Sequence, residues 1–420
     1  MSNAASGTFN TVSVVGLGYI GLPTAAVLAS RGLSVIGIDV SEHAVETVNA
    51  GKIHIVEPDL DIVVRSVVST GNLKATLVPE AADAFIIAVP TPFGEDHQPD
   101  LSFIKAAAET IAPVLQPGNL VILESTSPVG ATEKLADWLA QCREDLSFPQ
   151  QLGEKADINI AHCPERVLPG NVLQELVAND RIIGGMTPRC ATRAAALYQI
   201  FVRGECLLTD ARTAEMAKLT ENAYRDVNIG FANELSIICD RLKINVWELI
   251  RLSNRHPRVN ILSPGPGVGG HCIAVDPWFI VSAAPDEARL IRLAREVNDG
   301  KPNYVINKVL RAANQFKQPV IACFGLSFKP DIDDLRESPA LSITQALVDS
   351  EVAEILVVEP NIARLPDAFS GRGVQKVHHN EALERANIIL MLVAHKEFNG
   401  LSGDILHEKV VIDAAGALSH

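Results

Sequence analysis

The sequence predicts an α/β protein with two Rossmann-like doubly wound domains, joined by a long central helix and a helical dimerisation region. Short apolar stretches alternate with helical ones in the first part of the chain and again near its end, a pattern typical of parallel sheets. Between them no proline interrupts residues 213–242, where apolar residues recur at three- and four-residue spacing. A chain of 420 residues has room for roughly two to three domains. We therefore predict domains at residues 1–210, 211–316 and 317–420.

The composition excludes several classes of function. The chain has 36 Lys and Arg against 50 Asp and Glu, a formal net charge of -14, so neither nucleic acid nor an anionic membrane is expected as a partner. Its 7 cysteines include no CxxC pair and its 11 histidines no HExxH spacing, so no metal is expected. No apolar run approaches the roughly eighteen residues of a membrane span. Scattered cysteines without a disulfide pattern favour the reducing cytoplasm.

The first strand and the turn after it predict a dinucleotide-binding site. The strand Thr11–Val15 leads into Gly16-Leu17-Gly18-Tyr19-Ile20-Gly21, and an alanine-rich helical stretch follows. In a GxGxxG turn the first glycine permits the turn, the second lets a pyrophosphate approach the backbone, and the third lets the helix pack on the strand. The next strand, Leu33–Ile38, ends in Asp39, at the spacing expected of a carboxylate that binds ribose hydroxyls. Because Asp39 would repel a 2′-phosphate and no arginine follows it, we expect NAD rather than NADP.

Polar residues follow three further strands, at the ends where doubly wound sheets bind ligands. The strands expected at Ala84–Val89, Leu120–Leu123 and Ile158–Ala161 are followed by Thr91, Thr126 and Glu165, respectively. The two threonines are candidate ligand contacts, although threonine also forms ordinary turns. Glu165 is a candidate acid or base, or else an exposed surface glutamate.

The middle region predicts a long amphipathic helix from Thr213 to about Leu242 and a second helical stretch, Pro285–Asn298. The apolar stripe of the first helix is longer than one small domain needs to cover, so we expect it to form a homodimer. Lys218 and Asn222 lie four residues apart beside this stripe and therefore point the same way. Both are candidate site residues, although a solvated lysine is the more common case.

One cysteine lies in a segment that cannot form a regular helix or strand. The segment Pro264–Trp278 has the sequence PGPGVGGHCIAVDPW, and its glycines and prolines let the backbone approach a ligand. Asp276 comes four residues after Cys272, which would place the thiol and the carboxylate on one face of a helical turn. A thiol beside a carboxylate is suited to covalent chemistry at a carbonyl group. The alternative is that Cys272 is a small buried hydrophobic residue, as most free cysteines are.

The alternation of strands and helices returns after residue 317. Strands are expected at Pro319–Phe324, Ile355–Val358, Ile388–Val393 and Val410–Ile412. The first of these lacks the glycine triplet of a dinucleotide turn and is followed instead by Phe328, Lys329 and Arg336. An aromatic ring and two cations near a strand end suit a nucleotide base and its phosphates. A second nucleotide-binding domain is therefore expected.

Seven motifs, in order between residues 12 and 339, resemble the UDP-sugar 6-dehydrogenases of the UDP-glucose/GDP-mannose dehydrogenase family. They are GLGYIGLP, VPTP, ESTSPVG, CPER, EMAKLTENAYRD, GPGVGGHC with Asp276, and FGLSFKPDIDDLRESP. Such a set is far more specific than a single motif. The segment Asn254–Ile280 is similar to family members that oxidise UDP-N-acetyl-D-mannosamine. The resemblance implies an NAD-dependent, four-electron oxidation of the sugar C6 alcohol to a carboxylate, supplying a uronic acid for a bacterial surface polysaccharide such as enterobacterial common antigen.

The resemblance also implies roles for individual residues. Cys272 would add to the aldehyde, forming a thiohemiacetal and then a thioester, while Lys218 would stabilise the oxyanions of both oxidations. The other positions that match catalytic residues of the family are Asn222, Asp276, Thr126 and Glu165. Asp276 would orient or deprotonate a water that Thr126 helps to hold, and Glu165 would act in hydrolysis of the thioester.

Binding residues follow from the same matches. The implied NAD contacts are Gly16, Gly18, Tyr19, Ile20, Gly21, Asp39, Thr91, Thr126 and Arg336. The implied contacts to the UDP-sugar are Glu165, Arg166, Val167, Lys218, Asn222, Arg225, His256, Arg258, Gly269, Phe328 and Lys329. Among these, Lys329 resembles the lysine that binds UDP, and Arg336 an arginine at the junction of substrate and cofactor. His256 and Arg258 would reach the sugar of a neighbouring subunit.

The chain departs from the family pattern at one position, and three alternative functions stay open. The UDP-glucose enzymes have another glutamate four residues beyond Glu165, where this chain has Pro169, and this difference speaks against glucose. UDP-N-acetylglucosamine differs from UDP-N-acetylmannosamine only in configuration at C2, which sequence does not distinguish. A two-electron hydroxyacid dehydrogenase would have no use for Cys272. A non-catalytic NAD-binding protein would not need Cys272 together with Lys218, Asn222 and Asp276.

Overall fold

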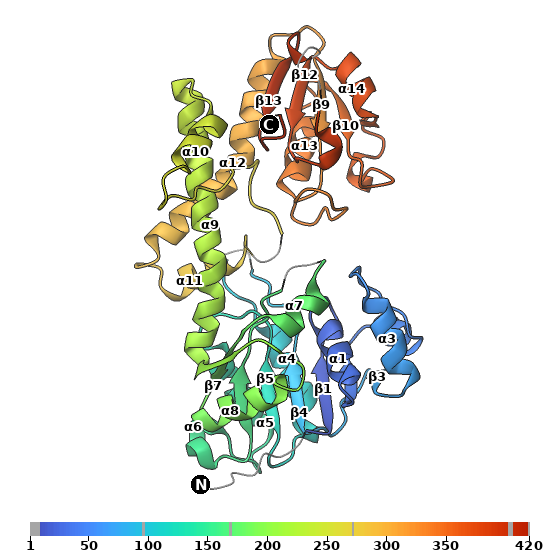
Figure 1. Ribbon diagram of the computed structural model, residues 1–420, viewed down its shortest axis with the longest axis vertical. Helices are drawn as coiled ribbons and strands as arrows, with labels where there is room; N and C mark the ends of the chain where they lie inside the picture. The colour runs from blue at the N-terminus through green and yellow to red at the C-terminus, as the bar shows by residue number, and fades with distance from the viewer. Residues whose placement is uncertain (1–8, 95–96, 168–169, 271–272, 402–405, 419–420) are drawn as a thin grey trace. The chain divides into compact units, whose positions relative to one another are not determined.

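The protein forms two compact units, Met1–Thr220 and Glu221–His420. The computed structural model describes residues 9–94, 97–167, 170–270, 273–401 and 406–418. Cys272 and Pro169 therefore lie outside the described residues. Each unit contains a sheet with helices on both faces, as Figure 1 shows. The predicted fold class, with two Rossmann-like sheets and a long central helix, is confirmed.

The described part of the first unit contains an eight-stranded sheet in the order β3-β2-β1-β4-β5-β6-β7-β8. Its strands are β1 (Thr11–Val15), β2 (Ser34–Ile38), β3 (Leu73–Thr76), β4 (Ala84–Ile87), β5 (Leu120–Leu123), β6 (Asn159–His162), β7 (Arg181–Gly185) and β8 (Cys206–Asp210). β6 and β7 are antiparallel, whereas the other neighbours are parallel. The winding reverses between β1 and β4, so their carboxyl ends form the switch point where such sheets bind ligands.

Helices cover both faces of this sheet. They are α1 (Gly21–Ser30), α2 (Glu42–Asn49), α3 (Leu60–Ser69), α4 (Ser102–Ile111), α5 (Ala131–Cys142), α6 (Pro149–Leu152), α7 (Val172–Ala178) and α8 (Pro188–Tyr198), with 3-10 turns at Ala112–Val114 and Gly153–Lys155. Alternate strand residues enter two cores: Ala84 and Ile86 belong to one with residues of α1 and α8, and Phe85 and Ile87 to another with residues of α4 and α5. Because both faces are covered, the central strands β4 and β5 are apolar throughout.

In the described chain, four α-helices lie between the last strand of the first sheet and the first strand of the second. α9 (Ala211–Leu242) begins in the first unit and continues into the second, where α10 (Val246–Ser253), α11 (Asp276–Ala283) and α12 (Arg289–Ala313) follow it. The predicted helical stretch Pro285–Asn298 is wrong at both ends, because α12 starts later and continues past Pro302. The buried residues Asn298, Lys301 and Val305 lie on both sides of that proline, and their packing outweighs its unfavourable helix propensity. No described helix combines the length and apolar character needed to cross a membrane.

The second unit ends in a smaller parallel sheet, which in the described chain has the order β11-β10-β9-β12-β13. Its strands are β9 (Val320–Phe324), β10 (Glu354–Val358), β11 (Gln375–Lys376), β12 (Ile388–Met391) and β13 (Val410–Asp413). α13 (Pro339–Asp349) and α14 (His379–Arg385) pack against it, and 3-10 turns occur at Asp367–Phe369 and Lys396–Phe398. Ile321 and Cys323 belong to one core and Ala322 and Phe324 to another, so this sheet is also covered on both faces.

Candidate functional site

The turn after β1 has the geometry that a bound dinucleotide requires. Gly16 has φ 91°, and a Cβ there would lie 2.6 Å from the carbonyl oxygen of Ala88. A Cβ at Gly21 would lie 1.8 Å from the carbonyl oxygen of Gly16, whereas a Cβ at Gly18 would meet no atom within 4 Å. The backbone at Gly18 thus borders open space. Because α1 has neither a side-chain cap nor an acidic residue in its first turn, its N-terminus suits a phosphate.

Two side chains beside this turn also fit a dinucleotide. One carboxylate oxygen of Asp39 accepts the backbone N–H of Leu17 at 2.8 Å, and the other accepts that of Ser41 at 2.9 Å. Asp39 is half-buried, so this fixed carboxylate still faces solvent. Beyond β4, the hydroxyl of Thr91 is buried and has no hydrogen-bond partner in the described chain. A buried polar group without a partner is where a ligand would complete the hydrogen bonding. Of the remaining expected contacts, Tyr19 is exposed and Ile20 half-buried.

Glu165, which follows β6, is a buried and ion-paired carboxylate. Its side chain is 7% exposed, one oxygen lies 2.6 Å from Nη1 of Arg181, and the other accepts the backbone N–H of Arg166 at 2.6 Å. Arg166 and Val167 are half-buried. The alternative of an exposed surface glutamate is therefore wrong. Arg181 was not identified from sequence, because a cation at the start of a strand gives no local pattern that names its partner.

A second buried carboxyl group, that of Glu124, is close enough to Glu165 for their charges to interact. Glu124 is 1% exposed and accepts hydrogen bonds from the hydroxyl of Tyr198 at 2.9 Å and from that of Thr24 at 3.2 Å. Burial raises the pKa of Glu124 to about 7, and the charge of Glu165 adds to this effect. Glu124 directly follows β5, two residues before Thr126, so a change in its ionisation would occur close to that candidate residue.

We expect the charge on Glu124 to destabilise the fold near neutral pH. Because its folded pKa is raised above the unfolded value, the stability it contributes is fully present below about pH 4.5 and is lost as the pH rises through about 7, by about 3 kcal/mol. Glu124→Gln keeps the shape and cannot ionise. The melting temperatures of wild type and variant should agree at pH 5, and the variant should melt higher at pH 8. Equal differences at the two pH values would contradict this assignment.

The half-buried Thr126 precedes a turn that is fixed by another buried carboxylate. Glu215, in the first turns of α9, accepts the backbone N–H of Gly130 at 2.6 Å and both the N–H (2.8 Å) and the hydroxyl (2.6 Å) of Thr132. These bonds attach the start of α5 to the start of α9. Lys218, half-buried, lies three residues further along the same helix. Sequence reasoning missed Glu215 because its partners are more than eighty residues away.

In the second unit the structure brings two of the expected catalytic residues together. Asn222 Nδ2 donates to Asp276 Oδ2 at 2.5 Å. Asp276 is 3% exposed and is the first residue of α11, where the helix dipole favours a carboxylate. Cys272 lies outside the described residues, four positions before Asp276. Lys218 is one helical turn before Asn222 in α9, so the two side chains project from the same side of the helix.

The glycine segment before Cys272 approaches its own chain closely. A Cβ at Gly269 would lie 2.6 Å from the carbonyl oxygen of Glu337, 2.8 Å from Pro339 and 2.9 Å from Cβ of Phe328. Gly269 therefore lacks room for a side chain because it packs against the loop after β9, and the expected approach of a ligand to these glycines stays a prediction. That loop carries Lys329, which is half-buried and whose ammonium group makes no hydrogen bond or ion pair with a described residue.

The other expected contacts in the second unit are exposed. Arg336 forms an ion pair with Asp334 at 2.6 Å, and Arg225 lies on the exposed side of α9. His256 accepts the backbone N–H of Arg258 at 3.3 Å, and both residues are exposed. Exposure of His256 and Arg258 is compatible with contacts to a neighbouring subunit.

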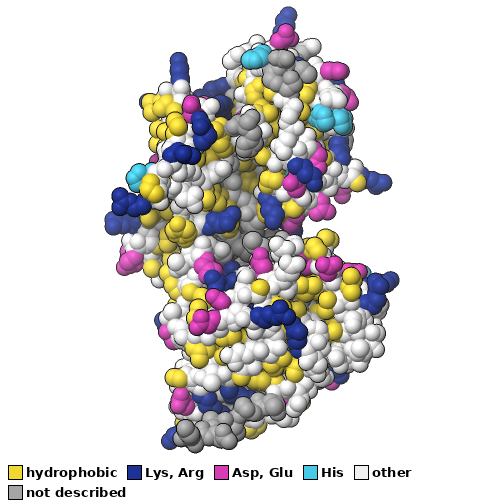
Figure 2. Space-filling model, viewed as in Figure 1, with side chains coloured by type: hydrophobic (Ala, Val, Ile, Leu, Met, Phe, Trp, Pro, Cys, Tyr) yellow, Lys and Arg dark blue, Asp and Glu magenta, His cyan; other side chains and the backbone are white. Residues whose placement is uncertain are grey.

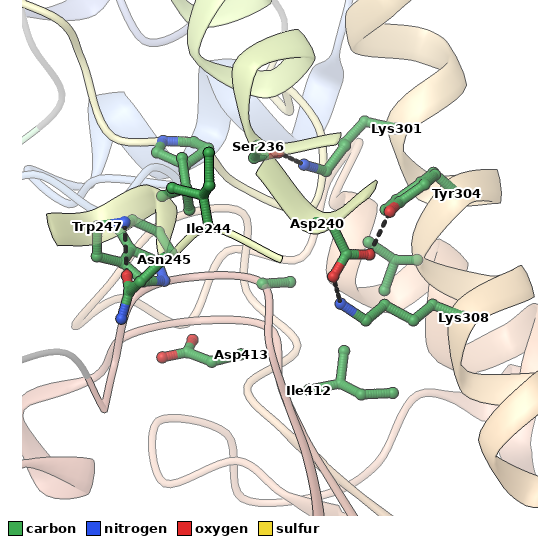
Figure 3. A pocket seen from close by; sticks show the side chains of 14 residues that line it. Ser236, Asp240, Ile244, Asn245, Trp247, Lys301, Tyr304, Lys308, Ile412 and Asp413 are labelled. Atoms are coloured by element: carbon green, nitrogen blue, oxygen red, sulfur yellow. Dashed lines mark hydrogen bonds and ion pairs between the residues drawn. The ribbon is translucent and has the colours of Figure 1, made fainter. Parts of the chain in front are cut away.

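A cavity of ≈ 260 Å³ lies elsewhere in the second unit and contains none of the expected residues. Figure 3 shows that, among the side chains lining it, Lys301 of α12 is bonded to Ser236 of α9, and Tyr304 and Lys308 of α12 are bonded to Asp240 of α9. Lys308 lies 2.6 Å from Asp240, and Tyr304 also donates to that carboxylate, so these charges are already paired. This cavity is not the candidate site.

Comparison with known proteins finds domains of one family in three consecutive parts of the chain. Residues 10–202 match the NAD binding domain of the UDP-glucose/GDP-mannose dehydrogenase family, residues 212–300 its central domain and residues 322–420 its UDP binding domain. An NDP-N-acetyl-D-galactosaminuronic acid dehydrogenase of Ralstonia nicotianae is 66% identical over 100% of this chain and 99% of its own. A UDP-N-acetyl-D-mannosamine dehydrogenase of Yersinia pestis is 62% identical over 97% of this chain and 99% of its own.

A solved structure agrees in fold as well. The UDP-N-acetyl-D-mannosamine dehydrogenase of Pyrococcus horikoshii superimposes with a TM-score of 0.85 at 38% identity, covering 97% of this chain and 96% of that one. The resemblance found in the motifs is therefore confirmed by similarity over the full length.

Proposed function

Because the chain belongs to the UDP-glucose/GDP-mannose dehydrogenase family, whose members include NAD-dependent UDP-sugar oxidoreductases, we propose that its substrate is UDP-N-acetyl-D-mannosamine. The product would be UDP-N-acetyl-D-mannosaminuronate, a uronic acid donor for a bacterial surface polysaccharide. The observation that carries this proposal is the hydrogen bond between Asn222 and the buried Asp276, in a chain that is 62% identical to a relative of that name. The division into domains at residues 1–210, 211–316 and 317–420, with NAD in the first and the UDP-sugar in the last, belongs to the same proposal.

In the first oxidation the C6 alcohol loses a hydride and a proton and becomes an aldehyde. NAD supplies the hydride acceptor for this step and for the next. Lys218 would stabilise the alkoxide that forms as the proton leaves, because an ammonium group in a partly dry site is a strong partner for an oxyanion. Gly16, Gly18 and Asp39 would hold the cofactor by the backbone and by the ribose, and Asp39 would exclude a 2′-phosphate.

In the second oxidation the thiolate of Cys272 adds to the aldehyde carbon and gives a thiohemiacetal, which loses a second hydride and a proton to become a thioester. Water then attacks the thioester, and the thiol leaves as the carboxylate forms. Asp276, oriented by Asn222, would accept a proton from this water, with Thr126 and Glu165 assisting. In sum, one alcohol, one water and two NAD give one carboxylate, two NADH and three protons. A free thiol of this kind fits the reducing cytoplasm.

A second candidate substrate has the galacto configuration, because the relative at 66% identity is named for N-acetylgalactosaminuronic acid. UDP-N-acetylglucosamine is the third. The test supplies purified protein with NAD and each UDP-sugar in turn and measures NADH formed per sugar consumed. UDP-N-acetylmannosamine should give the highest kcat/KM and two NADH per sugar. A preference for another sugar would overturn the substrate assignment, and a ratio of one would overturn the four-electron reaction.

We also propose that the protein is a homodimer built on α9. Tyr224, Phe231, Ile238 and Leu242 are spaced by seven, seven and four residues, so they form one stripe, and they are 72, 54, 45 and 61% exposed. Figure 2 shows hydrophobic side chains among lysines and arginines over the region of α9 and α10. Large exposed side chains in one stripe are unusual on a monomer and typical of an interface.

We expect Phe231→Glu to dissociate the dimer, because it would bury a carboxylate at the centre of the stripe. Sedimentation at micromolar concentration should give twice the chain mass of 45.1 kDa for the wild type and the chain mass for the variant. Ile62→Glu on α3 is the matched control, since Ile62 is at least as exposed, at 62% against 54% for Phe231, but lies outside the stripe. A monomeric wild type would refute the proposal.

A further inference from the structure

Both sheets have a glycine after one strand and an acidic residue after the neighbouring strand, joined by the same kind of hydrogen bond. In the first, Gly16 ends β1 with φ 91°, and Asp39, just after β2, accepts the backbone N–H of Leu17. In the second, Gly325 ends β9 with φ 92°, and Glu359, just after β10, accepts the backbone N–H of Leu326 at 2.7 Å. The same positions of the two sheets thus carry the same hydrogen bond.

The second arrangement differs in that its carboxylate is fully enclosed. Glu359 is 1% exposed, against a half-buried Asp39. Besides Leu326, it accepts the backbone N–H groups of Ser327 at 3.3 Å and of Asn361 at 2.9 Å. The Nε2 atom of His395, itself 0% exposed, lies 3.0 Å from it. With the side-chain amide of Asn361 at 3.4 Å, five donors occupy this carboxylate, so it cannot bind ribose hydroxyls and instead supports the histidine.

His395 connects this carboxylate to the loop after β9. Its Nδ1 accepts the backbone N–H of Asp331 at 2.9 Å and lies 3.0 Å from Nδ2 of Asn361. Because Nδ1 is an acceptor, the ring carries its proton on Nε2 and donates to Glu359. Asp331 has φ 63°, a conformation that non-glycine residues adopt only when the surroundings fix it. The carboxylate of Asp331 also accepts the backbone N–H of Lys396 at 3.0 Å, so Asp331 is bonded both to His395 and to the residue after it.

Lys329 lies inside the loop that these bonds hold. The hydroxyl of Ser327 donates to the carbonyl of Lys329 at 2.8 Å, and Asp331 is bound to His395 two residues later. Both sides of Lys329 are therefore attached to the pair of Glu359 and His395. Its ammonium group has no described partner of its own, so the loop alone sets the direction of this side chain.

We propose that Glu359 and His395 are positioning residues that hold Lys329 ready for the diphosphate of the UDP-sugar. The inference rests on the proposed function, because it takes Lys329 as a ligand of UDP. It assigns a purpose to a histidine that the candidate site did not include. A metal role for His395 with its neighbours Asp331 and Glu397 is disfavoured, since N–H donors already occupy Nδ1.

Two substitutions of His395 each keep one of the two hydrogen bonds of the imidazole, to Asp331 or to Glu359, and remove the other. In His395→Asn the amide oxygen replaces Nδ1 and can still accept from Asp331. In His395→Gln the amide nitrogen replaces Nε2 and can still donate to Glu359, but the acceptor for Asp331 is lost. We expect the Kd of UDP, measured by titration calorimetry on the full-length protein, to rise roughly fivefold to tenfold in the Gln variant and less than about threefold in the Asn variant.

Two controls distinguish positioning from general damage. His407→Gln changes an exposed histidine of the same domain and should leave the Kd of UDP unchanged. The KM of NAD and the melting temperature should stay close to wild type in His395→Gln, which a merely structural role would not predict. Lys329→Ala should weaken UDP binding at least as much as His395→Gln does.

The outcomes are separable. If Lys329→Ala weakens UDP binding and His395→Gln does not, the positioning inference is wrong while the role of Lys329 stands. If Lys329→Ala binds UDP normally, the role of Lys329 in the proposed function is wrong, and the positioning inference is overturned with it.

Discussion

Replacing Cys272 by alanine is expected to lower the rate of uronate formation by at least roughly 10³-fold, as loss of a catalytic nucleophile does. The reason is that the second hydride can leave only from a tetrahedral adduct, and without the thiol the aldehyde has no covalent partner. Binding of NAD and UDP-sugar should be close to wild type, because a small side chain is removed from the reacting centre alone. The measurement is NADH formed in steady state, with separate titrations of both ligands.

Cys272→Ser provides the matched comparison. A serine hydroxyl can form a hemiacetal and then an ester, but it is a poorer nucleophile than a thiolate and its ester hydrolyses more slowly than a thioester. A covalent adduct should therefore accumulate and appear in the mass of the intact protein. Near-normal uronate formation by Cys272→Ala would show that the thiol is not the nucleophile.

The fold followed from local patterns wherever a strand is central. β4 and β5 are apolar and buried throughout, and β1 and β2 are nearly so, so composition alone marks them. The strands that sequence analysis missed are β3, β7, β8 and β11. β3, β8 and β11 are edge strands and β7 belongs to the antiparallel pair. Their side chains are mixed, as in Leu73–Thr76 with its exposed lysine. For such strands pairing with a neighbour decides the structure, and pairing is not a local property.

Only part of the candidate site was predictable from the sequence. The glycines of the first turn and Asp39 are specified by spacing within one βαβ unit, and the structure gives them the expected geometry. Partners distant in sequence were not predictable: Arg181 beside Glu165, or Tyr198 on Glu124 seventy-four positions away. A buried carboxylate needs a donor, but sequence does not say which residue provides it.

A buried polar ladder between α9 and α12 supports the start of the cysteine segment. Arg295 and Asn298 of α12 both bond to Asp226 of α9, at 2.6 and 2.8 Å. Asn298 also accepts from Asn233 at 2.8 Å, and Asn233 in turn accepts the backbone N–H of Gly265 at 2.9 Å. These side chains are 0 to 1% exposed, so each depends on the others for its hydrogen bonds.

We expect Arg295→Met to destabilise the second unit by about 3–5 kcal/mol, because it leaves the buried carboxylate of Asp226 without its cation. The free energy of opening from hydrogen exchange of α9 and α12 measures this effect locally, without assuming that the whole chain unfolds in one step. Arg311→Met is the control: it removes an exposed arginine from the same helix and should change this free energy by less than about 0.5 kcal/mol.

The loss of stability in Arg295→Met should depend on pH. Burial raises the pKa of Asp226 to about 6 even beside Arg295, so ionisation of Asp226 lowers stability as the pH rises through that value. Without the arginine the folded pKa rises further, and the deficit of Arg295→Met should therefore widen between pH 6 and pH 8. Adding Asp226→Leu removes the unpaired carboxyl group and should restore most of the stability at pH 8. A double variant as unstable as Arg295→Met alone would show that lost packing, and not the unpaired charge, causes the defect.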